Sequence, residues 1–211
     1  MTDEKFDPNQ VQQAHDYLLA LTKLAVRFAE VHRAPRYPSG KRENDSEHSF
    51  HLALSSTELA ADYYPGLDNG LVSQFSLVHD LAESYSGDVW TINISEQDRD
   101  KKELAEKEAI IKLMNELPPY TAQLLKRYEA QQEPEARFVR FVDKLLPDMV
   151  NSVAGMASTF KDDHDVKSIE RLNEISDSHK TRLRDMFPEF EFIHLVHNLT
   201  WKTLTESLFK K

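Results

Sequence analysis

Apolar residues in this chain recur every three or four positions, and nowhere do they alternate with polar residues over the length of a strand. The clearest case lies near the N-terminus, where steps of three and four connect Val11, Ala14, Leu18, Leu21, Ala25 and Phe28. This spacing places the apolar side chains on one face of an α-helix. Since the 211 residues include only five glycines and no hairpin dipeptide between strand-like runs, the sequence predicts an all-α fold.

Prolines, glycines and capping residues divide the chain into segments of helical length. Helices are expected over 8–33, 47–64, 71–85, 96–117 and 135–155, with two more in the last third. The basic segment 33–46 contains two prolines and a glycine, so we expect a loop that ends at a helix cap, Asp45 or Ser46. Pro147 should kink or break the helix in which it lies.

The composition excludes several classes of function. The chain has no cysteine, which rules out disulfides, thiolate ligands and cysteine nucleophiles. Its net charge of −10 argues against binding to extended nucleic acid, although not against a small anionic substrate. No apolar run approaches the ~20 residues of a membrane span, and the acidic N-terminal segment is unlike a signal peptide. We therefore expect a cytoplasmic protein without membrane contact, with one helical domain over 1–211.

Ionisable side chains are concentrated in an otherwise apolar segment, LVHDLAESYSGD, over 77–88. Because burying such groups alone is costly, they should be paired, face a cavity or bind a metal. His79 and Asp80 offer nitrogen and oxygen ligands of the kind that divalent ions use. Adjacent helical residues point about 100° apart, so further ligands must come from other helices. The obvious donors are His48 and Asp143, the latter being the lone acid in the apolar run RFVRFVDKLL.

An ordered set of motifs resembles the HD-domain metal-dependent phosphohydrolases, most closely their 5′-deoxynucleotidase-like branch. Along the chain the motifs are Ser46-Glu47-His48, His79-Asp80-Leu81-Ala82-Glu83, Gly87-Asp88 and Asp143. The resemblance spans about 18–153 and implies a helical bundle in which four residues bind one divalent ion: His48, His79, Asp80 and Asp143. Residues from about 165 to 211 would form a C-terminal helical extension, to which the resemblance assigns no role.

The same resemblance implies roles for further polar residues. Glu83 would be the catalytic carboxylate that orients or deprotonates the attacking water, and Asp88 would contact the sugar or assist proton transfer. Arg33 would hold the phosphate oxygens, with Arg36 from the same basic segment as a further cation. Members of the branch often carry a bulky aromatic residue after the first arginine, where this chain has Ala34. Selection for 2′-deoxy sugars and for monophosphates therefore stays open.

The function predicted is release of phosphate from (deoxy)nucleoside 5′-monophosphates, a small-molecule substrate, with one Co, Mn, Fe, Ni or Zn ion, or Mg. Removal of triphosphate from (deoxy)nucleoside triphosphates is the nearest alternative. A non-catalytic module that binds metal or nucleotide, and metal-based oxidation, are the alternatives from other classes. A homodimer is common in the family resembled, but no residue pattern here requires one.

Two histidines near the C-terminus also have a spacing that metals use. His194 and His197 are three residues apart, but no acid or third histidine is evident beside them in the sequence. We interpret both as packing residues.

Overall fold

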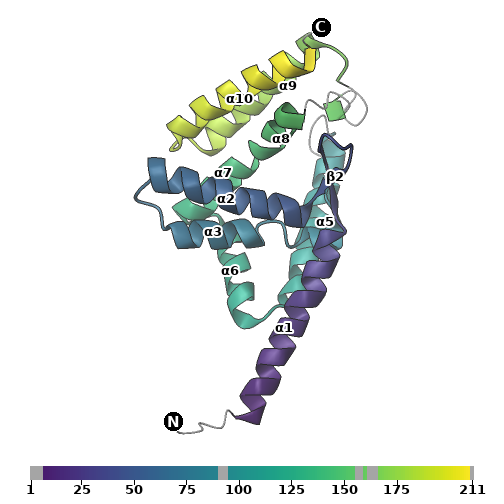
Figure 1. Ribbon diagram of the computed structural model, residues 1–211, viewed down its shortest axis with the longest axis vertical. Coiled ribbons are helices and arrows are strands. Elements are labelled where there is room, and N and C mark those ends of the chain that lie inside the picture. The colour runs from purple at the N-terminus through teal and green to yellow at the C-terminus, as the bar shows by residue number, and fades with distance from the viewer. Residues whose placement is uncertain (1–6, 90–94, 155–158, 161–165, 210–211) are drawn as a thin grey trace.

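The computed structural model describes residues 7–89, 95–154, 159–160 and 166–209, and this part of the chain is a bundle of helices with one short hairpin (Figure 1). The helices are α1 (Pro8–Ala29), α2 (Asp45–Tyr63), α3 (Asn69–Val78), α4 (Glu83–Ser86), α5 (Glu96–Met114), α6 (Pro119–Ala130), α7 (Pro134–Asp143), α8 (Leu146–Ala154), α9 (Ile169–Met186) and α10 (Glu191–Phe209). The strands are β1 (His32–Arg36) and β2 (Arg42–Asn44). The predicted all-α class is confirmed.

The basic segment that was expected to be a loop forms the hairpin instead. The first helix ends at Ala29 rather than near Arg33, and β1 pairs antiparallel with β2. Tyr37 N donates to Lys41 O at 2.9 Å, and Gly40 adopts a φ of 83°, a conformation that glycine reaches without steric cost. Arg33 therefore lies on a strand, with only 8% of its surface exposed.

Helices α2 and α3 lie side by side at the centre of the bundle, and α7 packs against both (Figure 1). The core between these helices contains large apolar side chains: Leu52, Val72, Phe75, Phe138, Phe141 and Val142. Two buried serines add a polar contact, because the Oγ atoms of Ser56 and Ser76 are 2.8 Å apart. This packing holds the ends of α2, α3 and α7 in fixed positions relative to one another.

The single helix expected over 71–85 is interrupted, so that prediction was wrong. α3 ends at Val78, a turn follows, and α4 begins at Glu83. The backbone bonds of the turn join residues three apart, as in the 2.8 Å bond from Glu83 N to Asp80 O, which is the tighter winding of a 3₁₀ turn. His79 and Asp80 lie at this interruption.

The two helices expected in the last third are present as α9 and α10, and they complete the core. Four side chains from α9, α10 and the segment between them belong to the main apolar cluster: Leu183, Phe187, Phe190 and Ile193. The rings of Phe141 and Phe187 stack with centroids 5.2 Å apart. A smaller cluster forms around Trp201: Phe160, Val166, Leu172 and Leu204. The predicted break at Pro147 is also confirmed, since α7 and α8 are separate helices.

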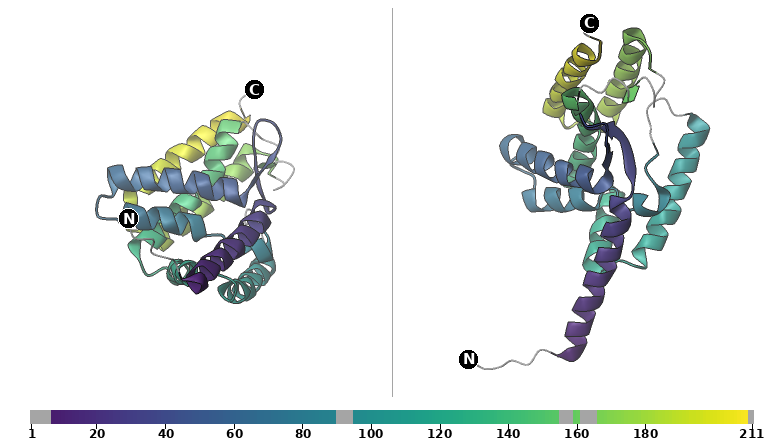
Figure 2. Two further views of the ribbon diagram at one scale, coloured as in Figure 1. Left: turned by 60° about the horizontal axis from the view of Figure 1, so that its bottom comes forward. Right: turned by 45° about the vertical axis from the view of Figure 1, so that its right-hand side comes forward.

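Helix α1 projects from the bundle, and only its C-terminal part is buried (Figure 2). Leu24 and Phe28 reach the core, whereas Val11 and Leu18 on the predicted apolar face are 56% and 67% exposed. Among the residues that the structure describes, no helix combines the length and the apolar character that crossing a membrane requires.

A capping box fixes the start of α2, the helix that carries His48 in its first turn. Asn44 Oδ1 accepts from Glu47 N at 2.9 Å, and Glu47 Oε2 accepts from Asn44 N at 3.2 Å. The N-cap of α2 is thus Asn44, whereas Asp45 or Ser46 was expected. We expect Asn44→Ala to lower the free energy of unfolding by about 1 kcal/mol, measured by urea denaturation. The control Asn9→Ala, exposed on α1, should change it by less than about 0.5 kcal/mol; equal effects would contradict the capping role.

Candidate metal centre

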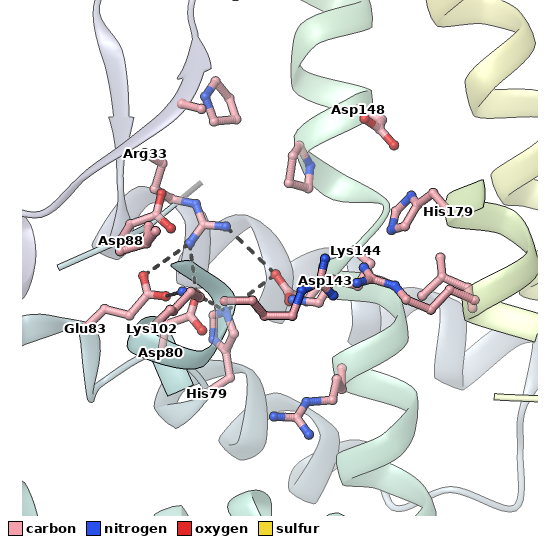
Figure 3. A pocket seen from close by; sticks show the side chains of 18 of the residues that line it. Arg33, His79, Asp80, Glu83, Asp88, Lys102, Asp143, Lys144, Asp148 and His179 are labelled. Atoms are coloured by element: carbon pink, nitrogen blue, oxygen red, sulfur yellow. Dashed lines mark hydrogen bonds and ion pairs between the residues drawn. The ribbon is translucent and has the colours of Figure 1, made fainter. Parts of the chain in front are cut away.

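The four predicted ligands come from distant segments and meet in one cluster. Figure 3 shows three of them: His79, Asp80 and Asp143. His48 lies in the first turn of α2, His79 and Asp80 in the turn after α3, and Asp143 at the end of α7. One nitrogen or oxygen atom from each lies within 4.8 Å of the other three. His48 Nε2 is 2.9 Å from Asp143 Oδ1, and His79 Nε2 is 2.9 Å from Asp80 Oδ2. The geometric condition for a shared ion is therefore met.

The hydrogen bonding of His79 tests whether these residues suit a metal. Its Nδ1 lies 2.9 Å from Ser76 O, which only accepts, so Nδ1 carries a proton and Nε2 is the nitrogen that can offer a lone pair to a metal. This Nε2 is buried without a hydrogen bond and faces Asp80 and, at 3.8 Å, Asp143 Oδ1. Lone pairs in such proximity repel unless a proton or a cation lies among them. The nitrogen and oxygen donors fit a divalent ion, and the bond to the Ser76 carbonyl is typical support for a metal-binding histidine.

Asp143 is held in its ionised form. Burial alone would raise the pKa of its carboxyl, but Lys144 and the two cluster histidines hold that pKa well below its usual value. Lys144 Nζ donates to Asp143 Oδ2 at 2.5 Å, which leaves Oδ1 directed toward His48. An ionised carboxylate with one oxygen facing the cluster is the state that a metal ligand requires.

Arg33 lies among the acids of the cluster. Its Nη1 donates to Asp80 Oδ2 at 2.9 Å and to Asp45 Oδ1 at 3.3 Å. The guanidinium also lies 3.8 Å from Glu83 Oε2 and 4.0 Å from Asp143 Oδ1. Burial alone would lower the pKa of Arg33. The charges of the surrounding carboxylates, of which Asp80 has the largest effect, raise this pKa well above its usual value. Arg33 thus offsets part of the negative charge, and contact with a substrate phosphate would require it to exchange one of these partners.

Glu83 lies beside the predicted ligands at the start of α4. Lys102 Nζ, from α5, donates to Glu83 Oε1 at 3.4 Å, whereas Glu83 Oε2 is buried without a hydrogen-bond partner. Burial, followed by the charges of Asp80 and Asp88, raises the pKa of Glu83 well above its usual value. A carboxylate fixed through one oxygen and open at the other can accept or return a proton.

The structure brings Asp88 to the site but not Arg36. Asp88 follows α4 and lines the same cavity as Asp80 and Glu83 (Figure 3). Arg36 ends β1 and is not among the described residues that line this cavity. Ala34, at the position where the resemblance leads one to expect an aromatic residue, does line it, and a methyl group fills less of the cavity than a ring would.

Sequence reasoning missed Asp45 and the lysines beside the acids. Asp45 is fully buried, and one of its oxygens lies within 4.8 Å of oxygens of Asp80 and Glu83. Burial, followed by the charge of Asp80, raises its pKa to about 7. Asp45 was interpreted only as a possible helix cap, so its place beside Asp80 and Glu83 was not expected. Its position three residues before His48, on the same helical face, could have indicated it. No local pattern in the sequence could have identified Lys102.

A cavity of about 780 Å³ extends from this cluster toward a second group of polar side chains (Figure 3). One face of α5, one face of α9 and the α7–α8 segment supply much of its lining, together with residues of β1, the α3–α4 segment, α6 and α10. The volume lies in the range typical of small-molecule sites.

The second polar group contains His197, for which the sequence offered no partner. Asp148 and His179 each place a potential ligand atom within 4.8 Å of one on His197, so the fold gives this histidine an acidic and a histidine neighbour that were not evident in the sequence. His194 is a packing residue as interpreted: its ring contacts Phe141 and its Nε2 is 3.0 Å from Phe187 O.

Comparisons with known proteins extend over most of the chain. A family model described as "HD domain" matches residues 27–191. The 5′-deoxynucleotidase hdd1 of Schizosaccharomyces pombe is 29% identical over 113 residues, which are 49% of this chain and 54% of that protein, so the chain aligns with about half of this curated relative. The crystal structure of a predicted metal-dependent phosphohydrolase from Magnetospirillum magnetotacticum has a TM-score of 0.68, covering 91% of this chain and 94% of that one at 22% identity. At that identity the likeness concerns the fold.

Proposed function

The chain belongs to the HD domain family, and from this premise we propose that it is a divalent-metal-dependent phosphohydrolase that releases phosphate from (deoxy)nucleoside 5′-monophosphates. The observation that carries the proposal is the convergence of His48, His79, Asp80 and Asp143, with one donor atom from each inside a 4.8 Å cluster. The similarity to a 5′-deoxynucleotidase and to a protein described as a metal-dependent phosphohydrolase supports it.

The four clustered residues would hold the ion, for which Co, Mn, Fe, Ni, Zn and Mg are the candidates. When bound, a divalent ion lowers the pKa of water and offsets the charge that develops on phosphoryl oxygens. His48 and His79 would bind the ion as neutral imidazoles and Asp143 as a carboxylate, so metal binding would release any proton that the imidazoles carry.

Glu83 would manage the proton of the attacking water. Its Oε2 has no hydrogen-bond partner, while Lys102 holds Oε1 in place. Attack by water forms a bond to phosphorus and the bond to the nucleoside oxygen breaks. The carboxylate takes up the proton that the water loses and returns it to the departing nucleoside oxygen. Two details favour this assignment over metal binding by Glu83: its contact with Lys102 and its place on α4, beyond the His79-Asp80 turn.

Arg33 and Asp88 would position the substrate. A guanidinium binds two phosphate oxygens at once, and Arg33 lies beside Asp80 at the cavity wall. Asp88 would accept a hydrogen bond from a sugar hydroxyl, because it lines the same cavity just after α4.

A product assay tests the proposal. Metal-stripped protein, resupplied with Mn or Co, should release orthophosphate from nucleoside monophosphates and leave triphosphates intact. Tripolyphosphate as the product would instead support the triphosphohydrolase alternative. Tight nucleotide binding without turnover over the whole panel would support the binding-module alternative.

A further inference from the structure

The end of the cavity away from His79 carries buried polar atoms without partners. Asp148 and Asn151 lie three residues apart on α8, and therefore on the same face, and both line the cavity. Only 3% and 2% of their surfaces are exposed. Within the described part of the chain, Asp148 Oδ2 and Asn151 Oδ1 have no hydrogen-bond partner. Asn151 Oδ1 is an acceptor, and Asp148 Oδ2 is one when its carboxyl is ionised, so a donor would satisfy both.

Among the described residues, no ion pair with a lysine or arginine balances Asp148. In the described residues its one ion-pair neighbour is His197, whose Nε2 lies 3.9 Å from Asp148 Oδ2. Burial lowers the pKa of His197 to about 3, so this imidazole is neutral. Burial alone raises the pKa of Asp148 to about 8, and N–H donors of a bound ligand would favour its ionised, accepting form. Because an unpaired buried acceptor destabilises a fold, two of them facing one cavity point to a ligand.

A metal ion is a poor fit at this end, although His179 also lies nearby. Trp201 Nε1 donates to His197 Nε2 at 2.8 Å, so Nδ1 carries the ring proton and neither nitrogen of His197 has a free lone pair. Burial, followed by the charges of Arg182 and Lys144, lowers the pKa of His179 to about 4. The same positive charges repel a bound cation. A neutral group that carries N–H donors suits the site better.

We propose that Asp148 and Asn151 form a base subsite that selects adenine and cytosine over hypoxanthine and uracil. The inference rests on the proposed function and names the residues that would set its specificity. The carboxylate and the amide oxygen accept from the exocyclic amino group, and the amide nitrogen can donate to the neighbouring ring nitrogen. Hypoxanthine and uracil carry a carbonyl oxygen in place of that amino group, which would face the acceptors directly.

The position of the pair agrees with a nucleotide that spans the cavity. Asp148 follows Asp143 by five residues, across the break between α7 and α8, and both residues line the cavity. Ile175 and Trp201 add apolar lining beside Asp148, as a planar heterocycle requires.

Substrate pairs that differ mainly at this one group test the inference: AMP against IMP, and CMP against UMP. We expect wild-type protein to bind and hydrolyse the amino member of each pair about tenfold better, because the partner base leaves buried acceptors unpaired. Asp148→Asn should bring each ratio to about one, since an amide can also donate to a carbonyl. Asn151→Ala should lower both ratios. Val153→Ala, on the exposed side of α8 at 86% exposure, should leave them unchanged.

Three further measurements separate the outcomes. Ribose 5-phosphate, which has no base, reports the phosphatase centre of the wild-type protein alone, and its failure together with all nucleotides would contradict the proposed function. If no substrate is hydrolysed, the affinities of AMP against IMP and of CMP against UMP, measured by calorimetry, still test the inference. Equal affinities within both pairs, no binding of either pair, or ratios that persist in Asp148→Asn would overturn it. Loss of one of two metal equivalents in Asp148→Asn would also overturn it, in favour of a second metal site.

Discussion

Asp143→Ala is expected to remove the bound divalent metal and to reduce phosphate release by more than about a hundredfold. Asp143 Oδ1 lies 2.9 Å from His48 Nε2 and 3.8 Å from His79 Nε2, so it joins the two imidazoles at the proposed ion. Substitution of residues that merely support a ligand typically costs 10- to 100-fold in affinity or activity, and loss of a ligand should exceed this. Elemental analysis of the purified variant and a phosphate-release assay measure the two effects. His79→Ala should behave in the same way.

The controls for this prediction distinguish metal loss from unfolding. Asp143 is buried beside Lys144, so the variant needs a check of helix content by circular dichroism. Asp143→Asn keeps the shape of the side chain and should also lose metal, because an amide oxygen is a weaker ligand than a carboxylate. Asp62→Ala, on the exposed end of α2, should keep both metal and activity. A folded Asp143→Ala protein with wild-type metal content would contradict the proposed centre.

The convergence of His48, His79, Asp80 and Asp143 could be predicted in part because several of them contrast with their surroundings in the sequence. Asp143 is a single acid in an apolar helical run, and His79 and Asp80 interrupt another such run. Burial of isolated ionisable groups is costly, so an ionisable residue in an apolar run indicates a function even from the sequence alone. The resemblance to a family, which rests on the order of the motifs along the chain, then implied that these residues lie together in the fold.

The interruption between α3 and α4 could not be predicted in the same way. No proline or glycine lies between Leu77 and Glu83, so local propensity favours a continuous helix there. The turn is compatible with side-chain pairs that come from far along the chain, such as Asp80 with Arg33 and Glu83 with Lys102. Tertiary contacts of this kind override local preference, and a window of sequence does not contain them.

The hairpin and the far end of the cavity escaped prediction for related reasons. β1 contains Pro35, and its polar and apolar residues do not alternate. Both features are typical of a loop rather than of a strand. It is buried because it packs on α8, an element more than a hundred residues later in the chain. Likewise, Asp148, His179 and His197 come from three different helices, so only their packing shows that the histidine has an acidic neighbour.

Glu83→Gln is expected to keep the metal and to lose most turnover, with kcat lower by about 10²- to 10⁴-fold, the usual contribution of a general base. Glutamine has the shape of glutamate and its Oε1 can still accept from Lys102, but it cannot take up a proton. The measurements are kcat, KM and metal content, with Glu103→Gln as the matched control, since Glu103 is exposed on α5 and lines the same cavity.

The comparison of Glu83→Gln with Asp143→Ala separates a catalytic carboxylate from a metal ligand. Glu83, Asp80 and Asp45 also place oxygens within 4.8 Å of one another, an arrangement that could itself hold a cation. If Glu83→Gln loses as much metal as Asp143→Ala, Glu83 is a ligand and the base must be sought elsewhere. If it keeps its metal and loses kcat while KM changes little, the proton-accepting role stands. The Lys102 contact, which fixes one oxygen and leaves the other open, favours this second outcome.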